Sequence, residues 1–161
     1  MSEFENVESY LKALGVNDEM DTFVGRKKVQ KLVYLLKQFG ADLPFGYNWY
    51  LHGPYSPKLT RNLLESEAVQ NREPPKLPSY ELERVNELRN FLAEDFYSVD
   101  SLELYASLIY LIKHAQEAKL SSKMSIIRFL LEKKPQFTRD EIEKAWDRIE
   151  SSGRWDNYMR F

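Results

Sequence analysis

The sequence predicts a mainly α-helical fold, a compact bundle of about seven helices with a short strand or hairpin near residues 45–52. Three observations lead to this prediction. Apolar residues recur at spacings of three and four along most of the chain, which is the period of a helix laid on a core. Capping residues and glycines stand at the ends of these stretches. The segment from Tyr47 to His52 instead alternates with the period of a strand.

The first two helices are predicted to end at Gly15 and Gly40, where a left-handed stop belongs. Asn6 is expected to cap the first helix, and Asp21 or Thr22 the second. One side of the second helix is apolar, so we expect it to lie on the core. The residues of this apolar side are Val29, Leu32, Val33, Leu36 and Phe39.

The opposite side of the second helix is cationic, with no acidic residue between Arg26 and Phe39. Such an arc suits an acidic partner or a nucleic-acid backbone, but it also suits a helix face that is merely solvated. We expect the arc to face solvent. Its members are Arg26, Lys27, Gln30, Lys31, Tyr34, Lys37 and Gln38.

The aromatic segment that follows is predicted as a strand with two different faces. Alternation places Tyr47, Trp49 and Leu51 toward the core, and Tyr50 and His52 toward solvent. Exposed aromatic rings offer a surface on which a base or a peptide side chain stacks. The candidate contact residues of this segment are Tyr50, His52 and Tyr55, and Gly53 with Pro54 is expected to form a tight turn for backbone reasons.

The third helix is predicted over residues 57–68, with Ser56 as its N-cap and Pro57 at its first position. The proline-rich stretch 70–79 is expected to be an exposed loop inside one domain, residues 1–161, because neither half is large enough for a secure core of its own. Four further helices follow, the fourth to the seventh of the chain. The helix that begins at the box Asp100–Glu103 is apolar nearly all round and is expected at the centre. Their predicted starts are Ser79, the box Asp100–Glu103, Ser122, and the capping box of Thr138 and Glu141, and the last helix is predicted to stop at Gly153.

The composition excludes several classes of protein. There is no cysteine, and the two histidines cannot supply a usual zinc site, so neither disulfides nor a metal centre are expected. No apolar stretch is long enough to span a bilayer, and no signal peptide is recognisable, so a cytoplasmic location is expected. Paired carboxylates, a nucleophile elbow and a phosphate loop are also missing, so we expect no enzyme, no catalytic residue and no cofactor.

The segments GRKKVQKLVYLL (residues 25–36) and WYLHGPYSPKL (residues 49–59) together resemble the YwgA-like family. They resemble more distantly the Panacea domain, which is SocA-like and phage-associated and has a "KLQKLLYY" helix and a "GP" turn. This resemblance implies a mostly helical domain with a few short strands. Panacea domains are described as antitoxins that bind toxins directly, and one branch acts as a proteolytic adaptor. The matching positions are Lys28, Gln30, Lys31, Leu32, Tyr34, Gly53 and Pro54.

The sequence therefore leads us to expect a non-enzymatic interaction module, regulatory or antitoxin-like, that binds a protein partner through the basic helix and the aromatic turn. The alternative is a DNA- or RNA-binding regulator that uses the cationic face of residues 26–39. The sequence is compatible with a homodimer, and no membrane contact is expected. The expected partner-binding residues are Arg26, Lys27, Gln30, Lys31, Tyr34, Lys37, Tyr50, His52 and Tyr55.

Overall fold

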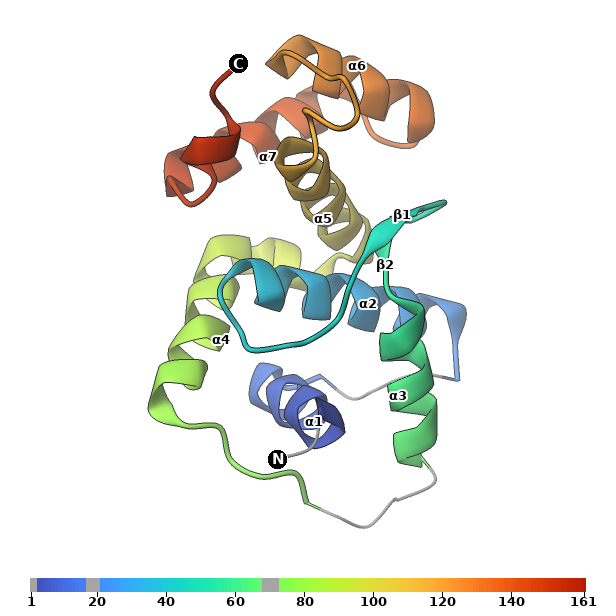
Figure 1. Ribbon diagram of the computed structural model, residues 1–161, viewed down its shortest axis with the longest axis vertical. Helices are drawn as coiled ribbons and strands as arrows, with labels where there is room; N and C mark the ends of the chain where they lie inside the picture. The colour runs from blue at the N-terminus through green and yellow to red at the C-terminus, as the bar shows by residue number, and fades with distance from the viewer. Residues whose placement is uncertain (1–2, 17–20, 68–72) are drawn as a thin grey trace. The chain divides into compact units, whose positions relative to one another are not determined.

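The computed structural model describes residues 3–16, 21–67 and 73–161 (Figure 1). Within these ranges the protein is mainly α-helical, as predicted, with seven α-helices and one two-stranded sheet. The chain groups into two compact units, Met1–Leu102 and Glu103–Phe161. The boundary between them falls inside the fifth helix, and the prediction of a single domain stays a prediction.

The elements of the first unit are α1 (Glu3–Leu14), α2 (Phe23–Gln38), β1 (Asn48–Tyr50), β2 (Gly53–Tyr55), α3 (Pro57–Glu67), α4 (Ser79–Leu92) and the 3₁₀ helix η1 (Ala93–Tyr97). Helix α5 (Val99–Lys113) leads into the second unit, which continues with α6 (Lys123–Lys133), α7 (Arg139–Ser152) and the 3₁₀ helix η2 (Asp156–Tyr158). None of the helices in the described ranges is both long enough and apolar enough to cross a membrane.

Helix α2 is the central helix of the first unit. It contacts α3, α4 and β2, while α1 packs on α3 and α4. Its N-cap is Thr22, whose Oγ1 accepts a hydrogen bond from the Gly25 N–H at 3.0 Å, as predicted. Every residue from Val29 to Leu36 is buried, and these include three members of the predicted solvent-facing arc, Gln30, Lys31 and Tyr34. A helix packed on several sides has no continuous solvated face.

Strands β1 and β2 form an antiparallel hairpin, in which Trp49 pairs with Pro54 and Tyr50 with Gly53. The turn is made by Leu51 and His52. The prediction that Gly53 and Pro54 form the turn is therefore wrong, because both belong to β2. Gly53 has a φ of +91°, a backbone conformation that favours glycine. Leu51 was expected in the core but is 82% exposed, since strand alternation ends where the pairing ends.

The predicted helix ends are correct where a local cap decides them. Ser56 caps α3, accepting from the Leu59 N–H, and Pro57 is the first helical residue. Three predicted N-caps are wrong. Asn6 already lies inside α1, and Ser79 is the first residue of α4, whose N-cap is Pro78. Helix α5 is capped by Ser98 rather than by the box at Asp100. Residues 68–72, with the predicted end of α3 and the start of the proline-rich loop, lie outside the described residues, and 73–78 form neither helix nor strand.

The second unit has well-defined helix starts. Ser122 and Ser125 form a capping box for α6, and Thr138 and Glu141 form the predicted one for α7. The hydrogen bonds from Thr138 hold the pKa of the Glu141 carboxyl below its usual value. Helix α7 ends at Gly153, which adopts the left-handed conformation as predicted. Helix α5 is buried over nearly its whole length, in agreement with the prediction of a central helix.

Candidate functional site

Gln30 joins helix α2 to the chain that leaves the hairpin. Its Nε2 donates to the Ser56 carbonyl and to Thr60 Oγ1, both at 2.8 Å, and its Oε1 accepts from the Ser56 N–H at 3.0 Å. The side chain is 1% exposed. A buried side-chain amide that pairs with both the N–H and the C=O of one residue holds that residue in place, as backbone pairing does in a β-sheet.

Two lysines of α2 hold other carbonyls of the same segment. Lys31 is buried and its Nζ donates to the Pro54 carbonyl at 2.6 Å. Lys37 Nζ donates to the Phe45 carbonyl and lies 6.0 Å from the centre of the Tyr47 ring. We call Gln30, Lys31 and Lys37 the hairpin clamp. Helix α2 thus fastens the chain before, within and after the hairpin.

Tyr34 belongs to the core rather than to a contact surface. It is 2% exposed, and its ring meets the Tyr47 ring edge to face, with centroids 4.9 Å apart. The prediction that Gln30, Lys31 and Tyr34 lie on a solvent-facing arc is therefore wrong. The physical reason is that β2 and the start of α3 cover this side of α2 and supply hydrogen-bond partners for its polar groups.

The remaining predicted residues lie near the hairpin tip and the first turns of α2. Tyr50 is 43% exposed, and Arg26, Lys27 and His52 are each partly exposed. The Phe23 ring meets the His52 ring at a centroid distance of 5.1 Å, so the start of α2 and the hairpin tip are neighbours, on the same side of the unit in Figure 1. We call the combined surface the hairpin patch: Phe23, Val24, Arg26, Lys27, Tyr50, Leu51 and His52.

Three apolar members of the hairpin patch were missed by the sequence prediction. Phe23 and Val24 are more than half exposed, and Leu51 is more exposed still. A signal for the first two existed, because Phe23 and Val24 fall outside the stripe that places Val29 and Leu32 on the core. Exposed large apolar side chains that gather on one surface are typical of interaction sites.

Tyr55 contacts the hairpin patch through the ring of Tyr50. Its hydroxyl lies 2.9 Å from Thr60 Oγ1, and its ring packs edge to face on the Tyr50 ring at 5.2 Å. This contact restricts the rotamers of Tyr50, so the orientation of its exposed ring is already restricted in the unbound protein.

The hairpin patch contains two cationic residues. Arg26 and Lys27 lie near the N-terminus of α2, and the first turn of this helix contains no acidic residue. The helix N-terminus adds the positive end of its dipole. The patch therefore combines apolar side chains with a cationic edge, which suits a partner with an apolar surface bordered by acids. Among the described residues no group of three or more His, Asp or Glu lies where it could hold a metal ion.

Tyr47 gives a pH prediction that tests the packing beneath the hairpin. Its hydroxyl is buried without a hydrogen bond among the described residues, and burial raises the pKa of the phenol above its usual value of 10.0. A raised pKa means that the folded protein keeps the proton longer than the unfolded chain, so stability falls as the pH rises above about 10. We expect Tyr47→Phe to reduce this fall, and to stabilise the protein by up to about 1 kcal/mol at neutral pH.

Urea denaturation of both proteins between pH 7 and pH 11 checks this prediction. Taking the difference between wild type and Tyr47→Phe cancels the titration of the other tyrosines and lysines. Parallel pH profiles for the two proteins would contradict the assignment.

Part of the chain is similar to a known protein. The chain is 30% identical over 59 residues to the protein named "Uncharacterized protein YwgA" of Bacillus subtilis (strain 168). The match covers 37% of this chain and 36% of that protein, so the chain spans about a third of the length of the relative it matches. No family model and no solved structure matches. The similarity supports a YwgA-like relation for part of the chain.

Proposed function

We propose that the protein is a non-enzymatic interaction module, and that the hairpin patch binds a protein partner whose apolar surface is bordered by acidic residues. The observation that carries the proposal is the contact between Phe23 and His52, because it joins two exposed apolar segments into one surface. The cationic edge of Arg26 and Lys27 supplies charge complementarity, which steers association and disfavours basic partners.

The test replaces the most exposed apolar residue of the hairpin patch with a charged one. Leu51→Asp is expected to weaken partner binding by about tenfold or more, because a carboxylate covered by an apolar partner surface loses its hydration. The matched control is Leu64→Asp on α3, where a leucine is 49% exposed outside the patch. Affinity purification of the full chain from its native cells, with quantification of co-purified proteins, measures the difference.

A partner that is lost with Leu51→Asp and kept with Leu64→Asp supports the proposal. Equal loss or equal retention in both variants contradicts it. Circular dichroism of both variants establishes that they are folded. Repeating the purification with nuclease and at increasing salt separates the nucleic-acid alternative, since binding through phosphates falls steeply with salt concentration.

The antitoxin role implied by the Panacea resemblance is a narrower form of the same proposal. In that case the partner is a toxic protein, and co-expression of this chain restores growth. The Leu51→Asp variant is then expected to lose the rescue and Leu64→Asp to keep it. Rescue by both variants would place toxin binding on another surface.

A further inference from the structure

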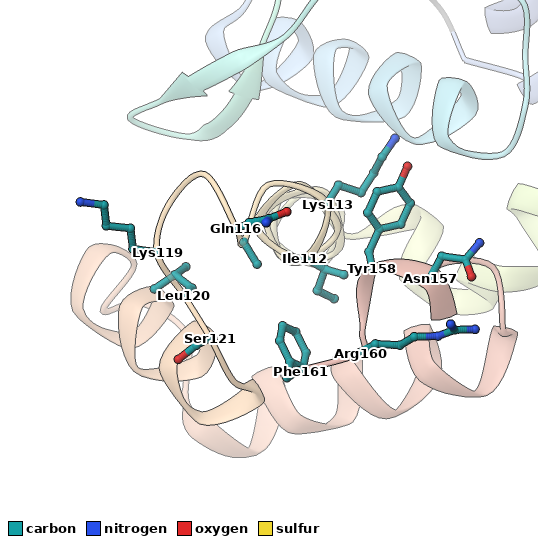
Figure 2. Close-up of a pocket in the computed structure, with 11 residues that line it drawn as sticks. Ile112, Lys113, Gln116, Lys119, Leu120, Ser121, Asn157, Tyr158, Arg160 and Phe161 are labelled. Carbon is teal, nitrogen blue, oxygen red and sulfur yellow. The ribbon is translucent and has the colours of Figure 1, made fainter.

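A second candidate site lies in the unit Glu103–Phe161. A cavity of about 700 Å³ is lined by the end of α5, the turn that follows it and residues 157–161. Figure 2 shows the side chains of its lining. This volume is within the range of small-molecule sites, which runs from about 300 to 1,000 Å³. The hairpin patch shares no residue with it.

Three large apolar side chains line the cavity. Ile112, Leu120 and Phe161 come from three different segments and point toward the same space (Figure 2). The Phe161 ring also lies 6.2 Å from the Trp146 ring of α7, and Phe161 is 52% exposed, so one aromatic face is open to an occupant. Such walls suit an aliphatic or aromatic body, whose transfer from water supplies most of the binding free energy.

The edge of the cavity is cationic. Lys113, Lys119 and Arg160 line it, and no Asp or Glu side chain does. Lys113 Nζ packs over the Tyr158 ring at 5.6 Å, and the charged ends of Lys119 and Arg160 point outward from opposite sides in Figure 2.

One negative side chain lies near this edge. Glu117, in the turn after α5, is 3.3 Å from His114 Nδ1 and does not line the cavity.

We propose that this cavity binds a small amphipathic carboxylate with an aliphatic body, of the kind represented by a medium-chain fatty acid. The aliphatic body fills the space between Ile112, Leu120 and Phe161. The carboxylate stays at the cavity mouth, where the positive charges of Lys113, Lys119 and Arg160 favour a negative group.

Titration of the full chain with decanoate, followed by ¹H–¹⁵N NMR, tests the proposal. We expect saturable binding of one molecule, with shift changes concentrated in residues 112–121 and 157–161. Decanol and decylammonium have the same body without the negative charge, and we expect them to bind about tenfold more weakly. Equal binding of all three compounds, shift changes spread over both units, or no saturation would overturn the proposal.

A charge-matched pair of variants separates a specific carboxylate site from general attraction to a basic surface. Lys119→Gln with Arg160→Gln is expected to weaken decanoate binding about fivefold and to leave decanol binding unchanged. The control is Lys144→Gln with Arg128→Gln, which removes the same charge from exposed positions that do not line the cavity. Equal effects of the two pairs would show that only net charge matters, and would overturn the proposed role of the cavity edge.

Discussion

Gln30→Ala is expected to lower the free energy of unfolding by about 2–4 kcal/mol. The substitution removes three hydrogen bonds and leaves the N–H group of Ser56 buried without the Gln30 amide as its partner. It also leaves a cavity at a side chain that is 1% exposed. The cost is large because the partners stay buried when the amide is gone, whereas an exposed amide exchanges its partners for water.

Chemical denaturation of the wild type and Gln30→Ala measures this loss. The control is Asn86→Ala, an exposed polar residue of α4, which we expect to change stability by less than about 0.5 kcal/mol. Gln30→Glu is a sharper companion variant, since it keeps the acceptor, loses both donors and adds a buried charge. Stability of Gln30→Ala equal to that of Asn86→Ala would show that the hairpin clamp does not depend on this amide.

Lys134→Met is expected to destabilise the protein by about 3–5 kcal/mol. Lys134 Nζ lies 3.1 Å from Glu103 Oε2, and the two side chains are 2% and 0% exposed. Gln136 Nε2 donates to the same oxygen at 3.1 Å. Removing the ammonium leaves a buried carboxylate without its countercharge, although methionine fills most of the space of the lysine stem.

The double variant Glu103→Leu with Lys134→Met distinguishes lost charge from lost packing. We expect it to recover most of the stability, because neither ion then has to be desolvated. Lys133→Met, at the neighbouring exposed lysine, controls for the removal of a positive charge and should be nearly neutral. A double variant as unstable as Lys134→Met would mean that packing, and not the unpaired carboxylate, causes the loss.

Local signals in the sequence predicted those parts of the fold that depend on neighbouring residues. Thr22, Ser122 and Thr138 cap the helices that they were expected to cap, because a cap is formed by groups two or three positions apart. The apolar stripe of α2 was also predicted correctly, since its period is a property of the helix alone.

The candidate site was predicted only in part because it depends on contacts distant in sequence. Gln30 was assigned to a solvent-facing arc, whereas its partner Ser56 stands 26 positions away and no periodicity reveals it. Polar residues enter a core when such partners exist. The family resemblance includes both segments, since its matching positions contain Gln30 and Lys31 together with Gly53 and Pro54. In the structure the two segments are joined by the hydrogen bond from Lys31 to the Pro54 carbonyl.

The hairpin clamp has a consequence for how the hairpin patch would recognise a partner. The entropic cost of ordering the hairpin tip arises when the protein folds and not when the partner binds. A complex would therefore form on a preorganised surface and dissociate slowly. Loosening the clamp would then raise the dissociation rate although no clamp residue touches the partner. An affinity scan alone would therefore count Gln30 and Lys31 as contacts, and hydrogen exchange at the β1–β2 amides would reveal their indirect role.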